Sequence, residues 1–191
     1  MKTKSFKFLG HYVNDKLDWD DHISNVIRKT NSEIYALSRA KNFLPVSAKI
    51  KIYNSLVKSY LDYASIAYGT ACKMFLDKLY INQKRALINV LNTKYNAHIQ
   101  PVQIKLKQLG LYDIIKYNNL IFMHELRYGK LPSSFINILS MRSDEGATIG
   151  RHDEGNFIIP QNNSKFNFPL LEAARDWNTL PNYYKNLSKI K

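Results

Sequence analysis

Apolar residues recur at helical spacing through most of this chain, and the pattern predicts a mainly α-helical fold. The first helix is expected to begin near Asp18, with Asp21 three residues later in an arrangement that resembles a capping box. Pro45 marks a break after it. The residues of its apolar stripe are Ile23, Val26, Ile27, Thr30, Ile34 and Leu37.

Further helices are predicted downstream at the same spacing. A second runs from about Val46 to Ala67 with Tyr53, Val57 and Leu61 inward, and a third covers about Lys73 to Leu91. Shorter helices are expected over 102–109, 111–128 and 168–178. The segment 141–167 is polar and irregular, with one apolar triplet at 157–159 that is compatible with a short strand.

The N-terminus follows a different period. Bulky residues near period two, Phe6 and Phe8 with Tyr12 beyond them, predict a strand or one arm of a hairpin. Gly10 interrupts this pattern and indicates a bulge or a close approach by another backbone. The predicted fold class is therefore mainly α, a helical bundle with a short N-terminal β-strand or hairpin.

Charge is the strongest compositional signal. The 191 residues carry a net charge of +13 and a pI of about 9.7, which favours a polyanionic partner. Nucleic acid is the first expectation and an anionic membrane surface the second. The alternative is a lysine-rich surface from an AT-biased genome, which the abundance of Asn, Lys, Ile and Tyr also fits.

Candidate chemistry is sparse. The single cysteine, Cys72, allows no intramolecular disulfide, favours a reducing compartment and is expected to be a buried or half-buried thiol. The histidines are scattered, so the sequence predicts no metal site, and we expect no cofactor, no catalytic residue and no small-molecule substrate. No apolar run reaches the roughly 18 residues of a membrane span, so we expect an intracellular protein of cytoplasm or nucleus without a membrane partner.

Five short segments, in order and spread over nearly the whole chain, resemble the reverse transcriptases of non-LTR retrotransposons, most of all the jockey and CR1-like elements. They are Phe8-Leu9-Gly10 with Leu17, Trp19, His22 and Ile23; Phe43-Leu44-Pro45 with Tyr53, Ser55, Leu56, Tyr63 and Tyr68-Gly69; Leu79 with Gln83-Lys84-Arg85-Ala86; Leu106 with Leu109-Gly110-Leu111-Tyr112-Asp113; and Ala173-Ala174-Arg175-Asp176-Trp177-Asn178-Thr179-Leu180-Pro181.

The resemblance implies that the chain takes part in RNA-directed DNA synthesis but does not itself catalyse it. It implies that 1–17 is a strand and turn from the palm edge, 18–140 a helical thumb-like domain, 141–167 an irregular loop, and 168–191 a C-terminal helix with a basic tail. A thumb closes on the template–primer duplex, so RNA or RNA–DNA backbone and the palm and fingers of the parent polymerase are the implied partners. The sequence has no Tyr-x-Asp-Asp segment for the polymerase metals, so this chain alone is expected to be a fragment without polymerase activity.

The candidate residues fall into two groups. For contacts to a nucleic-acid backbone or base we expect Lys49, Lys51, Lys58, Tyr63, Lys84 and Arg85. As structural positions of the signature, with Trp19 and His22 anchoring the first helix, we expect Phe8, Leu9, Gly10, Leu17, Trp19, His22, Trp177, Asn178 and Pro181.

Two other functions remain open at this point. One is a retained small protein that uses the same basic fold to bind RNA or chromatin. The other is a stand-alone basic helical interaction protein with no polymerase role, whose charge reflects genome composition. A salt-dependent nucleic-acid binding curve separates the last from the others.

Overall fold

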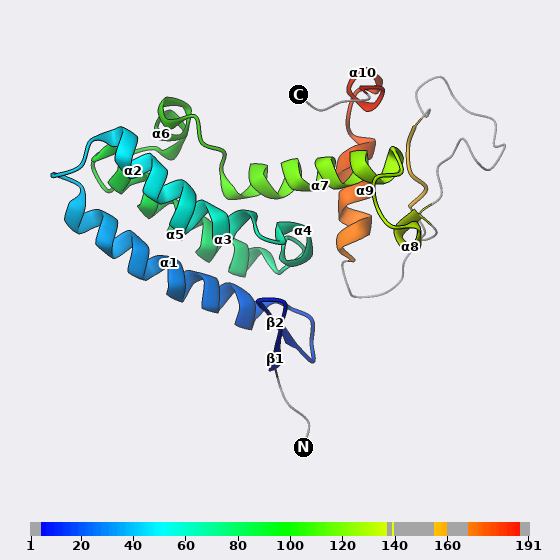
Figure 1. Ribbon diagram of the computed structural model, residues 1–191, viewed down its shortest axis with the longest axis horizontal. Helices are drawn as coiled ribbons and strands as arrows, with labels where there is room; N and C mark the ends of the chain where they lie inside the picture. Colours follow the sequence, from blue (N-terminus) through cyan, green and yellow to red (C-terminus); the bar gives the residue numbers. More distant parts are fainter. Residues whose placement is uncertain (1–4, 137–138, 140–154, 160–167, 188–191) are drawn as a thin grey trace. The chain divides into compact units, whose positions relative to one another are not determined.

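The computed structural model describes residues 5–136, 139, 155–159 and 168–187 (Figure 1). Its elements are mostly helices with one small antiparallel sheet, which confirms the predicted fold class. The chain forms two compact units, Met1–Ile115 and Lys116–Lys191, and the division falls inside helix α7 (Leu111–Arg127). That boundary lies within the 18–140 segment for which we expect a single helical domain.

The N-terminal sheet is a tight β-hairpin. Strands β1 (Ser5–Phe8) and β2 (His11–Asn14) pair in register from Ser5 opposite Asn14 to Phe8 opposite His11. Leu9 and Gly10 form the connecting turn with φ angles of 45° and 86°, and a two-residue turn of type I′ requires both to be positive. Of the two alternatives for Gly10, the bulge is corrected because this glycine is the second turn residue, and the atoms nearest to its Cβ position belong to the Tyr63 side chain and not to another backbone.

Helix α1 (Asp20–Ala40) confirms the first predicted stripe, because Ile23, Val26, Thr30, Ile34 and Leu37 are all buried. Its start differs slightly from the prediction. The chain enters through Trp19 in the left-handed region at φ 65°. The Asp18 carboxylate accepts the backbone N–H of Asp20 at 3.1 Å, which satisfies one of the free donors of the first turn.

The second predicted helix, Val46 to Ala67, is divided into several elements. Helix α2 (Val46–Ile52) passes into a π-helix, η1 (Tyr53–Lys58), and then into α3 (Ser59–Asp62). In η1 the hydrogen bonds reach five residues back, as in Ser59 N–H to the Asn54 carbonyl.

The chain then breaks, which the sequence prediction missed. Ala64 takes φ 50° before a single turn, α4 (Ser65–Tyr68). The carbonyl of Leu61, near the end of α3, accepts a hydrogen bond from the buried Tyr68 hydroxyl. This side-chain bond stands in for the backbone partner that a continuing helix would supply.

Helix α5 (Lys73–Leu91) packs most extensively against α1, and α6 (Ile99–Leu106) packs on α5. A buried polar contact joins the first pair, because the Asn82 amide donates to the Thr30 hydroxyl at 2.5 Å. The core of this unit comprises Ile23, Val26, Ile34, Leu37, Tyr53, Val57, Leu61, Tyr68, Leu76, Leu79, Ala86, Leu87, Val90, Val102, Leu106, Leu111 and Ile115.

The second unit contains the end of α7 and the short helices α8 (Ser133–Ile136), α9 (Pro169–Asn178) and α10 (Asn182–Lys185). Helix α9 confirms the helix predicted over 168–178. The predicted strand at 157–159 is absent from the described part, where only Phe157 forms an isolated bridge. The core is formed by Met123, Leu126, Leu139, Phe157, Leu171, Ala173, Ala174 and Trp177.

The signature residues of α9 hold segment 155–159 in place. The Trp177 indole N–H donates to the Gly155 carbonyl at 2.9 Å. The Asn178 side chain accepts the Phe157 N–H at 3.0 Å and donates to the Phe157 carbonyl at 2.9 Å. Pro181 is exposed and stands directly before α10. The irregular loop expected at 141–167 lies outside the described residues except for 155–159.

Candidate nucleic-acid interface

Tyr63, the candidate base-stacking residue, is built into the hairpin turn. Its hydroxyl donates to the Leu9 carbonyl at 2.7 Å, and its ring stacks on His11 with centroids 4.9 Å apart. A Cβ placed on Gly10 would lie 3.5 Å from the Tyr63 ring. The side chain is 53% exposed, so a base could reach only the part of the ring that His11 and the turn leave open.

Behind Tyr63 lies a cluster of aromatic rings centred on His22. Its ring centroid is 4.6 Å from that of His11, 5.5 Å from that of Tyr68 and 6.2 Å from that of Trp19. Within the described chain, neither ring nitrogen of His22 has a hydrogen-bond partner. Burial, together with the neighbouring charges of His11 and Lys29, lowers the pKa of His22 to about 4. The residue is therefore neutral at pH 7 and joins the hairpin to α1 by packing.

Other signature residues of the hairpin region face solvent. Phe8, Leu9 and Leu17 are more than half exposed, and Phe6 beside them is 55% exposed. Leu17 has φ 53°, an uncommon conformation for a branched side chain. The signature therefore contains two kinds of position, one packed in the aromatic cluster and one presented on the surface.

Lys49 does not occupy the exposed position that we predicted for it. It is 2% exposed, and its ammonium group donates to the Lys41 carbonyl at 3.0 Å. The reason is its spacing: Lys49, Tyr53, Val57 and Leu61 follow at intervals of four, and all are buried on one side of the helix. Sequence reasoning took the lysine as a surface residue because of its charge.

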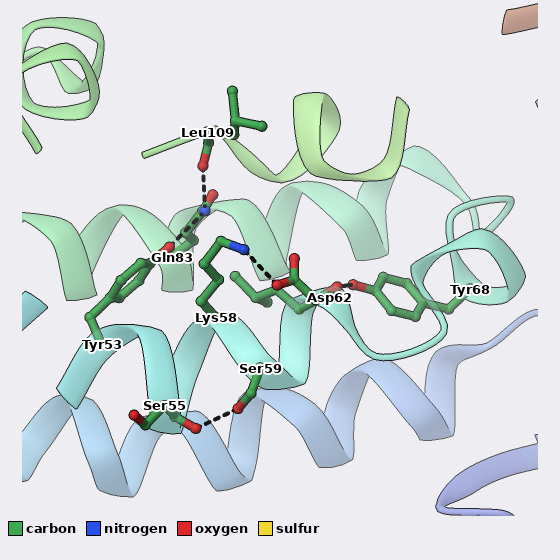
Figure 2. A network of polar contacts seen from close by, with 9 residues as sticks. Tyr53, Ser55, Lys58, Ser59, Asp62, Tyr68, Gln83 and Leu109 are labelled. Carbon is green, nitrogen blue, oxygen red and sulfur yellow. Dashed lines mark hydrogen bonds and ion pairs between the residues drawn. The ribbon is translucent and has the colours of Figure 1, made fainter. Parts of the chain in front are cut away.

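The other predicted basic residues keep some or all of their access to solvent. Lys51 and Arg85 are exposed, and Lys84 is half-buried. Lys58 forms an ion pair with Asp62 at 2.5 Å, one helical turn away (Figure 2). Such a pair at a partly exposed site contributes at most about 1 kcal/mol, but it engages the ammonium group that a phosphate would need.

Gln83 links the helices that carry these basic residues. It is 1% exposed, and its amide donates to the Tyr53 hydroxyl at 3.0 Å and to the Leu109 carbonyl at 2.9 Å (Figure 2). Burial raises the pKa of Tyr53 to about 12, so the phenol stays protonated. Sequence periodicity placed Gln83 on the inward face, but its two partners lie 30 and 26 residues away in the chain and no sequence signal identifies them.

The sequence predicts a basic tail over 185–191, but the first residue of that tail is buried. Lys185 is 1% exposed, and its ammonium group donates to the Asn156 side chain at 2.6 Å and to the Asn178 carbonyl at 3.3 Å. This lysine therefore belongs to the core of the second unit, and the positive charge of the chain overstates the charge on its surface.

The described residues carry few other chemical features. Among the residues that the structure describes, no three His, Cys, Asp or Glu side chains gather as a metal-binding group. Cys72 is exposed, which corrects the expectation of a buried or half-buried thiol; it directly precedes α5. No helix in the described ranges is long and apolar enough to cross a membrane.

The chain is similar in sequence to known proteins. No family model and no solved structure matches the chain. It is 26% identical over 134 residues to the RNA-directed DNA polymerase from mobile element jockey of Drosophila melanogaster, covering 69% of this chain and 14% of that protein. The corresponding polymerase of Drosophila funebris is 24% identical over 149 residues, covering 76% and 16%. These matches confirm the predicted resemblance to a jockey-like reverse transcriptase, of which the chain spans about one seventh.

Proposed function

We propose that this chain is the thumb part of a non-LTR reverse transcriptase, and that it holds the template–primer duplex by its phosphate backbone. The observation that carries the proposal is the similarity to jockey polymerases along most of the chain, in a protein with a net charge of +13. Backbone contacts fix position and carry no sequence information, so binding would be independent of sequence.

The basic residues of α2, η1 and α5 are the proposed contacts. Lys51 and Arg85 are exposed and Lys84 is half-buried. Lys58 contributes less, because it must first leave the Asp62 carboxylate. Lys49 is excluded by its burial. Tyr63 remains a proposed contact through the exposed part of its ring.

In this proposal the chain performs no chemistry alone. The two-metal reaction of a polymerase requires carboxylates held around both ions, and the sequence lacks the Tyr-x-Asp-Asp segment that supplies them. The palm and fingers of the parent polymerase would provide the active site. The thumb would keep the duplex in register with it.

The test is binding of a short RNA–DNA duplex, measured by fluorescence anisotropy across a range of salt concentrations. Each phosphate contact contributes a slope of roughly 0.9 to the fall of log K with log salt. The double variant K51E/R85E should therefore flatten the slope by roughly two and weaken binding for all sequences alike.

A charge-matched control separates local contact from general attraction. Lys94 and Lys116 are also exposed and lie outside the proposed contact set, so K94E/K116E should retain most of the slope. Equal losses in the two variants would contradict the proposed contacts. If the unsubstituted protein shows no salt-dependent binding, the chain is instead a basic interaction module without a nucleic-acid role.

A further inference from the structure

Acidic residues are missing from a large part of the first unit. The stretches 34–61 and 78–112 contain no Asp or Glu, and apart from His98 all their ionisable groups of basic character are lysines and arginines. The two stretches are neighbours in the fold, because α2 and α6 both pack against α5. This part of the unit therefore has a positive field that favours a polyanion.

Phe43 lies within this acid-free region, on the loop 41–45 that joins α1 to α2 at one end of the first unit (Figure 1). Its side chain is 86% exposed, the largest fraction among the large apolar and aromatic side chains that the structure describes. The backbone beneath it is fixed. The Phe43 N–H donates to the Ala40 carbonyl at 3.0 Å, and the buried Lys49 ammonium donates to the Lys41 carbonyl at 3.0 Å. The ring is thus presented to solvent on a held loop.

A second exposed ring lies on the neighbouring loop, 92–98, which joins α5 to α6. Tyr95 is 71% exposed. The two loops are joined by a side-chain hydrogen bond, because the Asn92 amide donates to the Asn42 carbonyl oxygen at 3.2 Å. Asn42 directly precedes Phe43, and Tyr95 follows Asn92 by three residues. Two exposed aromatic rings therefore come from a pair of loops that are bonded to each other.

Each exposed ring has an exposed cation close to it in the chain. Arg39 lies four residues before Phe43, and Lys94 directly precedes Tyr95. Proteins that bind single strands combine these two features, since cations follow the phosphates and aromatic rings stack on the bases. In a duplex the base faces are covered by their neighbours in the stack, so surface rings of this kind suit unpaired bases.

We propose that Phe43 and Tyr95 form a stacking platform for a single strand of nucleic acid, with Arg39 and Lys94 beside its phosphates. Binding is tolerant of sequence, because every base offers a π-face. RNA and DNA share this chemistry. The platform goes beyond the duplex binding proposed above and shares no residue with the contacts proposed there.

The experiment compares two single strands that differ only in their bases. One is an oligomer of about ten thymidines, within the usual site sizes of single-strand binding proteins, and the other is an abasic strand with the same number of phosphates. Fluorescence anisotropy with the full chain should show that the thymidine strand binds about tenfold more tightly or better. Equal affinities would overturn the proposal, because the contact would then be with phosphates alone. A uridine strand repeats the comparison for RNA.

The variant F43A/Y95A removes both rings and no charge. It should bind the thymidine strand only as tightly as the abasic strand, whose affinity stays unchanged. F43Y/Y95F keeps a ring at both positions and should keep the preference for bases. If F43A/Y95A retains the full preference, the platform is wrongly placed.

A matched control removes the same two ring types elsewhere. Phe168 and Tyr183 in the second unit are 52% and 74% exposed, and F168A/Y183A should leave the preference for bases intact. An equal loss there would contradict the assignment to Phe43 and Tyr95. K51E/R85E should weaken the binding of both strands but keep the ratio of their affinities, which distinguishes failure of the platform from failure of duplex binding.

An anionic membrane surface is the other partner that exposed aromatic rings and cations fit. Vesicles that contain phosphatidylserine provide this comparison. Vesicle binding that F43A/Y95A abolishes, together with no preference for bases in the oligomer experiment, would overturn the proposal in favour of a membrane-binding surface.

Discussion

Tyr63 is held to the hairpin by two contacts of different kinds, the hydroxyl bond to Leu9 and the ring stacked on His11. Tyr63→Phe removes only the first. Because this bond is open to solvent, we expect a loss of about 0.5–1 kcal/mol in the free energy of unfolding, measured as a lower urea midpoint at unchanged m-value. Tyr95→Phe, at a side chain 71% exposed, should change neither.

The buried, neutral His22 makes stability depend on pH. Its pKa is about 4 in the folded chain and 6.5 without its neighbours. Between these values the unfolded chain binds a proton that the folded chain does not, so stability falls as pH falls from 6.5 to about 4. At 1.36 kcal/mol per pKa unit the loss reaches about 3 kcal/mol, which urea unfolding at successive pH values would measure.

Replacement of the imidazole isolates this contribution. His22→Phe keeps an aromatic ring in the cluster and should flatten the slope between pH 6.5 and 4. Part of the slope will persist, because burial also lowers the pKa of His11. The exposed His98 provides the control: His98→Gln should leave the slope unchanged, and an equal effect there would contradict the assignment to His22.

At the scale of elements, the sequence predicts a helix correctly where a single stripe of apolar residues runs along its whole length. Helix α1 is such a case, because its apolar residues keep helical spacing from Ile23 to Leu37. The segment 46–67 keeps an apolar stripe as well, but a π-helix and a break at Ala64 interrupt it. The break depends on Tyr68 reaching the Leu61 carbonyl, a tertiary contact that periodicity does not contain.

The hairpin shows the same limit. Alternation predicts β structure, but Leu9-Gly10 is not one of the common turn pairs such as Asn-Gly, so the sequence pattern does not identify the turn. A leucine at φ 45° is uncommon. The hydrogen bond from Tyr63 to the Leu9 carbonyl, 54 residues away in the chain, favours this turn.

In the second unit, the Asn178 side chain bonds both backbone groups of Phe157, as a neighbouring strand would. Asn178→Ala would leave both the N–H and the carbonyl of Phe157 without their partner, at a cost of about 2 kcal/mol. Amide exchange of Phe157 should accelerate by the corresponding factor. The nearby Asn182→Ala should leave that exchange rate unchanged, and a similar acceleration there would argue against the two-bond clamp.

Across the whole molecule, two core clusters that share no residue predict local responses to core substitutions. Leu79→Ala should cost about 2–5 kcal/mol and Trp177→Ala about 3–5 kcal/mol. Hydrogen exchange should show lost protection in α5 for the first and in α9 for the second. Along α7 the loss of protection should differ between the two variants: the amide of Leu111 should lose protection in Leu79→Ala, and the amide of Met123 in Trp177→Ala. Uniform loss in both variants would contradict two separate cores.

The net charge was predictable from composition, but whether each charged side chain is exposed and unpaired was not. Lys49 and Lys185 are buried against carbonyl groups, and Lys58 is paired. Each of these contacts depends on where the backbone turns, which the sequence pattern does not report. Exposure at Lys51 and Arg85 agrees with the predicted interface, whose binding role stays a prediction.

The π-helix at Tyr53–Lys58 has a consequence for how this region varies among relatives. A π segment is an α-helix with one residue inserted, and its wider turn absorbs the extra length locally. An alignment should therefore tolerate a one-residue gap between Tyr53 and Lys58. A shorter relative would wind there as an ordinary α-helix, with its equivalents of Tyr53 and Leu61 still facing the core.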